Sequence, residues 1–98
     1  MDQRLTPSQL ALYRAVDEVL HYVWDPIGVS RIPEARDEYH AYLPIVFQML
    51  VDGNDAAQVA KYLSSVIVDR IGRSPDFQHN TNVAKLLVSW RLRASYIP

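Results

Sequence analysis

The sequence lacks cysteine entirely, holds only three glycines among 98 residues, and has no long apolar run. Without cysteine, a disulfide framework and thiolate chemistry are both excluded, and the absence suits a reducing compartment. The few glycines form no phosphate-binding loop. A membrane-spanning helix needs about 20 consecutive apolar residues, so we expect no contact with a membrane. The first residues, Met1 to Arg4, lack the basic stretch and apolar core of a signal peptide.

Neither sign of charge dominates, because ten basic and eleven acidic side chains leave a net charge of −1. A nucleic-acid-binding domain usually carries a positive excess, so we expect no direct contact with nucleic acid. The charges are nevertheless unevenly distributed. Residues 1–55 hold nine acids and four bases, whereas residues 56–98 hold two acids and six bases. This asymmetry indicates either an acidic face that meets a partner or two halves that attract each other within one fold.

Hydropathy follows a helical period in the first half of the chain. Thr6 and Gln9 form a capping-box pattern before an amphipathic stretch, which Pro26 should end. A second helix is expected from Pro33 onward, and Pro44 interrupts its apolar stripe. Two interpretations compete there: a break between two short helices, or one helix bent at the proline. Pro44 lies opposite the apolar stripe, where a proline lets a helix curve around a core, and this favours one kinked helix.

The second half of the chain contains two more helical patterns. Asp55 and Gln58 repeat the capping-box pattern before a third helix over residues 56–71, and Gly72 is the expected C-cap. Asn80 or Thr81 is expected to cap a last helix, with Phe77 as an anchor in the preceding loop.

No stretch of the sequence alternates with the period of a β-strand. We therefore predict a compact all-α domain of about four helices over residues 1–98, with the second helix kinked at Pro44.

Residues with catalytic potential are few, and we expect no enzyme, no cofactor and no metal. Asp17, His21 and Asp25 follow a spacing of four residues, so two carboxylates could flank one imidazole. The alternative is an exposed ladder of charged side chains along a helix, and this interpretation is favoured. His40 and His79 stand alone in the sequence and are expected on the surface.

The densest charge feature is the acidic segment that contains Glu34, Asp37 and Glu38. Acids at a helix start complement the helix dipole, which is one explanation. The other explanation is an acidic face that meets a basic partner by charge complementarity. Tyr39 and Tyr42 lie beside these acids but fall on the apolar stripe, so we expect them in the core.

A distinctive motif pattern covers roughly residues 20–72. Its runs are Trp24 to Val29, Pro33 to Tyr39 and Tyr42 to Pro44, with weaker matches at Tyr62, Leu63 and Gly72. It resembles a group of small, all-helical bacterial proteins with a WDPIG…DEYxxYxP pattern, some of which are similar to immunity partners of polymorphic toxins, including those of contact-dependent growth inhibition. The resemblance implies a cytoplasmic protein that neutralises one toxin domain, often a nuclease, and it carries no catalytic residue across. We interpret the motif itself as fold-specifying.

The resemblance implies an immunity (antitoxin-like) protein, and the acidic segment suits one that occludes a cognate toxin domain with a basic surface. The alternative is a generic helical interaction or regulatory module without a toxin partner. The expected state is a monomer or a weak homodimer. The candidate partner-binding residues share polar character and an expected outward position; they are Asp25, Glu34, Asp37, Glu38, His40 and Gln48.

Overall fold

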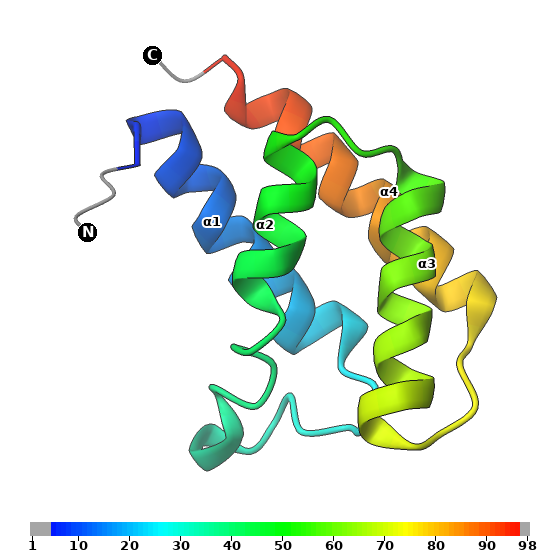
Figure 1. Cartoon of the computed structure of the whole chain (residues 1–98). Helices are drawn as coiled ribbons and strands as arrows, with labels where there is room; N and C mark the ends of the chain where they lie inside the picture. Colours follow the sequence, from blue (N-terminus) through cyan, green and yellow to red (C-terminus); the bar gives the residue numbers. More distant parts are fainter. Residues whose placement is uncertain (1–4, 97–98) are drawn as a thin grey trace.

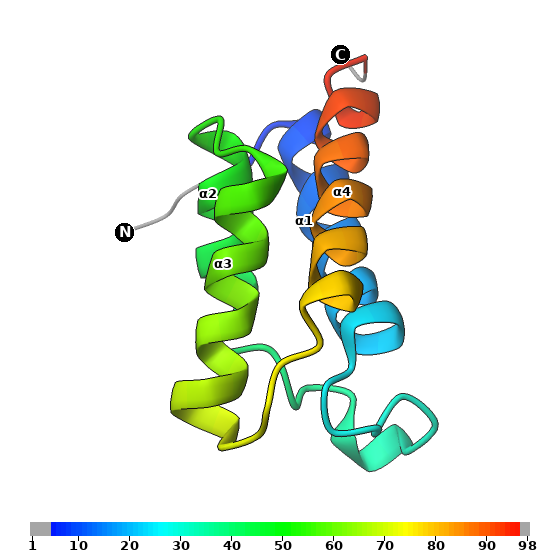
Figure 2. The same ribbon diagram turned by 90° about the vertical axis from the view of Figure 1, so that its right-hand side faces the viewer.

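The computed structural model describes residues 5–96, in which four α-helices form two layers. The helices are α1 (Pro7–Val19), α2 (Leu43–Val51), α3 (Ala56–Val66) and α4 (Phe77–Ala94). Figure 2 shows α1 and α4 in one layer and α2 and α3 in the other. The segment 25–42 lies at the end of the bundle opposite the start of α1 and the end of α4 (Figure 1). Residues 5–96 contain no strand, so the predicted all-α fold is confirmed.

Two helix starts agree with the prediction from local chemistry. The side chain of Thr6 accepts the backbone N–H of Gln9 at 3.1 Å, and the side chain of Gln9 accepts the backbone N–H of Thr6 at 3.0 Å. Asp55 and Gln58 form the same reciprocal pair at 2.8 and 2.9 Å. Each capping residue satisfies backbone donors that the helix itself leaves open, and such a cap contributes about 1 kcal/mol.

The ends of α1 and α3 share a widened final turn. α1 continues into η1 (Leu20–Trp24) and α3 into η3 (Ile67–Ile71), both π-helical. A left-handed residue then ends each helix: Asp25 with φ 35° and Gly72 with φ 77°. Gly72 confirms the predicted C-cap, because glycine adopts this conformation without a steric penalty. Asp25 pays that penalty, and its side chain compensates for it as described below.

The predicted second helix from Pro33 through a kink at Pro44 is not what the structure contains. Residues 33–35 form a short 3-10 turn, η2 (Pro33–Ala35), and residues 36–42 continue as turns with hydrogen bonds three residues apart. Pro44 lies in the first turn of α2. Proline has no N–H to donate to the carbonyl of residue 40, and its ring would clash with that carbonyl. A proline is tolerated in the first turn of a helix, where no such bond is needed. The α-helix therefore begins at Leu43 and does not extend back to Pro33.

The start of α4 also differs from the prediction. Asp76 is the N-cap, and its carboxylate accepts the backbone N–H of His79 at 3.0 Å. Phe77 therefore belongs to the first helical turn and is 68% exposed, rather than anchoring a loop. Asn80 is not a cap, because it lies a full turn inside the helix and is 1% exposed. An acidic residue at an earlier position provided the cap that the sequence interpretation assigned to Asn80 or Thr81.

All four helices contribute to one hydrophobic core. Its fully buried side chains are mostly aliphatic, with one indole at the end of η1. The largest apolar members are Trp24, Leu20, Leu50, Leu63 and Leu87. No helix within residues 5–96 is both long and apolar enough to cross a membrane.

A chain of polar contacts crosses this core. The indole N–H of Trp24 donates to Oδ1 of Asn80 at 3.1 Å, and Nδ2 of Asn80 donates to Oγ of Ser64 at 3.0 Å. Three elements are thereby joined: the end of α1 through η1, the first turns of α4, and α3. A buried amide without partners would cost a few kcal/mol, whereas one with partners specifies which side chains meet.

We predict that Asn80→Ala lowers the free energy of unfolding by about 2–3 kcal/mol, because it leaves the indole N–H of Trp24 unsatisfied and opens a cavity. Urea denaturation followed by tryptophan fluorescence measures this loss. The matched control is Asn82→Ala on the same helix, since Asn82 is exposed and bonds only Gln78 within the described residues. Equal stability of the two variants would contradict the structural role of Asn80.

Candidate partner-binding site

The carboxylate of Asp25 organises the segment 25–42. Its oxygens accept the backbone N–H of Val29 at 2.7 Å, the backbone N–H of Ser30 at 3.0 Å and the hydroxyl of Tyr39 at 2.7 Å. Burial disfavours the charged form, but these hydrogen bonds together hold the pKa of Asp25 below its ordinary value. The carboxylate of this predicted partner-binding residue is therefore engaged within its own loop.

Tyr39 connects this loop to the core. Its hydroxyl accepts the backbone N–H of Ile27 at 3.2 Å while it donates to Asp25, and its ring lies 5.3 Å from that of Trp24. The side chain is buried, as the apolar stripe predicted. Burial raises the pKa of Tyr39, and the nearby carboxylate of Asp25 raises it further, so the phenol remains a hydrogen-bond donor at neutral pH.

Asp17 on α1 forms a second anchor for the same segment. The guanidinium of Arg36 donates to both oxygens of Asp17, at 2.8 and 3.1 Å, and Nε2 of His40 lies 3.1 Å from one of them. Burial opposes the charged carboxylate, but Arg36 and His40 lower the pKa of Asp17 overall. Arg36 also lies over the ring of Tyr22, 5.3 Å from its centroid. The bidentate ion pair between Arg36 and Asp17 fixes the orientation of the two side chains as well as their distance.

Three of the predicted site residues extend from this anchored segment into solvent. Glu34, Asp37 and Glu38 are exposed, and no ion pair or side-chain hydrogen bond engages them within residues 5–96. Glu34 lies in η2, and the other two lie in the turns that follow. We call these three residues the acidic surface. The structure thus brings three of the six candidates together at the end of the bundle formed by segment 25–42.

The remaining two candidates have partners of their own. His40 is exposed and contacts Asp17, so it belongs to the anchor beneath the acidic surface. Gln48 is exposed in the middle of α2, where its side chain donates to Asp52 at 2.8 Å. Neither side chain joins the acidic surface through a hydrogen bond within the described residues.

The spacing of Asp17, His21 and Asp25 led to neither of the expected arrangements. His21 is 3% exposed, so the favoured interpretation of an exposed ladder is wrong. Asp17 binds Arg36 and Asp25 binds Tyr39, and within residues 5–96 neither carboxylate forms a hydrogen bond with His21. Nδ1 of His21 has no hydrogen-bond partner among the described residues. No cluster of potential metal ligands occurs in this part of the chain. The ring of His21 packs instead against those of Tyr22 and Tyr39.

Within residues 5–96, no basic side chain of the second half forms an ion pair with an acid of the first half. Both ion pairs found within residues 5–96 involve Asp17, and their basic partners, Arg36 and His40, come from the same half. Arg91 donates instead to the carbonyls of Leu50 and Asn54, at 3.2 and 2.7 Å, near the end of α2. The charge asymmetry read from the sequence therefore persists in the folded chain.

Two residues that position the site were not identified from the sequence. Asn80 shares a helical face with Val83, Ala84 and Leu87, and this spacing of three, four and seven residues could have placed it in the core. His79 was expected on the surface but is half-buried. Its ring donates to the carbonyls at the end of η1, 2.9 and 3.1 Å away, and so caps that helix from α4.

Comparison with known proteins adds no relative: no family model, no curated protein and no solved structure matches this chain. The assignment of a function therefore depends on the residues and geometry given above.

We predict that Asp25→Asn lowers the free energy of unfolding by about 1–2 kcal/mol at neutral pH, since it removes a charge that accepts three hydrogen bonds. Asparagine tolerates the left-handed conformation, so backbone strain is not introduced. The pKa of Asp25 is lowered on folding, so its contribution is complete above about pH 5 and is lost as the pH falls below the unfolded value of 3.8.

The difference between wild type and Asp25→Asn should therefore shrink between pH 5 and pH 2, roughly, in urea denaturation followed by circular dichroism. Asp37→Asn, an exposed carboxylate of the same segment, is the control and should have little effect at either pH. A pH-independent difference would show that the charge of Asp25 does not stabilise the loop.

Proposed function

We propose that this protein is an immunity (antitoxin-like) protein of the cytoplasm, which binds a cognate toxin domain through the acidic surface of Glu34, Asp37 and Glu38. The observation that carries the proposal is the exposure of these three carboxylates without any pairing to the basic half, within residues 5–96. Neighbouring carboxylates repel one another, which raises the free energy of the isolated protein. A partner of opposite charge relieves this repulsion, so the acidic surface favours binding of a basic surface.

The anchored base beneath the acidic surface supports this proposal. Asp25 holds the loop from one side and Asp17 holds it from the other, so the exposed acids project from a segment that is ordered by hydrogen bonds. A binding surface that is ordered before contact loses less conformational entropy when its partner arrives. In this proposal Asp25 and His40 position the loop, the three exposed acids make the contact, and Gln48 lies at its margin.

The proposed mechanism is steric and electrostatic occlusion rather than chemistry. A nuclease binds phosphate groups with basic side chains, and an acidic protein surface complements the same side chains. Complementary charge accelerates association of this protein with the nuclease. The helical bundle then covers the basic side chains and excludes the nucleic acid from them. We therefore propose a nuclease domain as the toxin.

The proposal predicts that Asp37→Lys combined with Glu38→Lys weakens protection against the toxin. The association rate should fall about tenfold or more at low salt, because attraction becomes repulsion, while the isolated variant keeps its stability. As the candidate toxin we propose the C-terminal domain of the protein that the gene immediately upstream encodes. The measurement is survival of cells that co-express the variant with this domain, together with association kinetics of the purified pair.

The control changes net charge by the same amount elsewhere. Asp52→Lys with Asp69→Lys reverses two exposed acids outside segment 25–42. Asp52 follows α2, whose end lies opposite that segment (Figure 1), and Asp69 lies in η3. This variant should protect as wild type does. Equal protection by both double variants would show that the acidic surface does not bind the toxin. If the wild-type chain does not neutralise the domain encoded upstream, the proposal of a toxin partner is contradicted.

A second candidate function follows from a different face. Phe77 and Leu92 are 68% and 60% exposed, and Val88 between them is half-buried on the same side of α4. Exposed apolar side chains aligned on one helix are typical of a helix-pairing interface. The alternative proposal is therefore a helical interaction module that forms a homodimer through α4.

The homodimer proposal predicts a concentration-dependent dimer in sedimentation equilibrium, which Phe77→Ser with Leu92→Ser should convert to monomer. The two side chains are exposed, so the monomer should remain folded. A chain that is monomeric at every concentration would contradict this alternative, and it would leave the toxin-binding proposal unchanged.

A further inference from the structure

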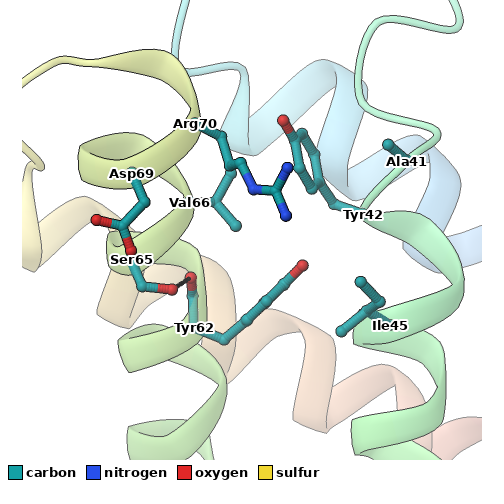
Figure 3. Close-up of a pocket in the computed structure, with 8 residues that line it drawn as sticks. All are labelled: Ala41, Tyr42, Ile45, Tyr62, Ser65, Val66, Asp69 and Arg70. Carbon is teal, nitrogen blue, oxygen red and sulfur yellow. Dashed lines mark hydrogen bonds between the residues drawn. The ribbon is translucent and has the colours of Figure 1, made fainter.

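A groove lies between the start of α2 and the end of α3 (Figure 3), and no residue of the acidic surface lines it. It encloses about 370 Å³, and its walls come from the turns before α2, from α2 itself, from α3 and from η3. A volume of this size lies near the lower end of the range for small-molecule sites, which begins at about 300 Å³. The groove is therefore large enough for a compact ligand.

Hydrogen-bond donors converge in this groove. Figure 3 shows the guanidinium of Arg70 between the side chains of Tyr42 and Tyr62. Within residues 5–96, Arg70 forms no ion pair, and neither tyrosine hydroxyl forms a hydrogen bond. Ser65 does not add to them, since its hydroxyl donates to the backbone carbonyl of Tyr62 at 2.7 Å. The groove thus holds one fixed positive charge and two phenols with unused donor capacity.

Acceptors for these donors are scarce among the lining residues. Asp69 is the one carboxylate that the described chain places at the groove, and in Figure 3 it points away from the guanidinium of Arg70. Burial raises the pKa of Tyr62, and Tyr42 raises it further while Arg70 lowers it. Tyr62 therefore remains protonated and able to donate at neutral pH. A surplus of donors of this kind is complementary to an oxyanion.

The shape and charge of the walls narrow the class of oxyanion. Ile45, which is 46% exposed, and the two tyrosine rings provide apolar contact area beside the donors. A single guanidinium balances one negative charge, and Asp69 at the rim disfavours a second. A phosphate dianion is therefore less well matched than a carboxylate that carries an apolar body.

We propose that the groove between α2 and α3 binds a small monocarboxylate with an aromatic or branched apolar body, held by the guanidinium of Arg70 and the hydroxyl of Tyr62. The carboxylate accepts from these two groups, and the apolar body lies against Ile45 and the ring of Tyr42. This site is separate from the proposed toxin-binding surface and does not depend on it.

The test is titration of the isotope-labelled protein with sodium benzoate, followed by nuclear magnetic resonance shifts. Saturable shifts should appear at Tyr42, Ile45, Tyr62 and Arg70, with a dissociation constant in the millimolar range that is typical of a ligand this small. Benzyl alcohol supplies the ring without the charge, and inorganic phosphate supplies the charge without the ring. Both should bind at least about tenfold more weakly than benzoate.

Variants separate a carboxylate site from a merely apolar groove. Arg70→Gln should weaken benzoate binding about tenfold or more, and Tyr62→Phe, which keeps the ring, should weaken it several-fold. Arg73→Gln removes the same charge from an exposed arginine outside the groove and should bind as wild type does. Arg70 is exposed, so its replacement should leave the fold intact.

Absence of saturable shifts in the groove, equal binding of benzyl alcohol, tighter binding of phosphate, or unchanged benzoate binding in Arg70→Gln would each overturn the proposal. The Asp37→Lys, Glu38→Lys variant should bind benzoate normally, so failure of one proposal can be distinguished from failure of the other.

Discussion

The packing of η1, α3 and α4 depends on the hydrogen bonds of the buried Asn80 amide. It accepts from Trp24 at the end of η1 and donates to Ser64 on α3, so one side chain determines how three elements meet. Trp24 immediately precedes the left-handed residue Asp25, and any shift of the indole would carry the segment 25–42 with it. The placement of an exposed acidic surface at one end of the bundle is therefore coupled to a hydrogen bond in its interior.

Carboxylates in the first half of the chain divide into two groups with different physical roles. Asp17 and Asp25 are partly buried and have lowered pKa values. Their carboxylates stabilise segment 25–42, which contains little regular secondary structure. The acids of the acidic surface have no such contacts within the described residues and keep their charge available to solvent. The same residue type thus builds the support and supplies the proposed contact, and only the environment of each side chain distinguishes the two.

Sequence reasoning succeeded where the determining interactions lie within a few residues of one another. The capping boxes at Thr6 and Asp55 and the left-handed Gly72 are local features, and the structure confirms them. It failed where a local pattern had two solutions. Pro44 is compatible with a kink or with a first turn, and the helical period alone did not decide between them. Asn80 suited a cap as well as a buried position, and the nearby Asp76 took the role of cap.

The sequence by itself determined the helical class, most helix ends and the polarised charge, because these follow from hydrophobic period, capping chemistry and composition. Only the tertiary structure decided which carboxylates remain exposed, why His21 is buried rather than flanked by acids, and where Arg70 meets two tyrosines. Those outcomes depend on side chains far apart in the chain, such as Asp17 with Arg36 and Trp24 with Asn80. Their pairing is selected by packing of the whole core, which no local window of sequence contains.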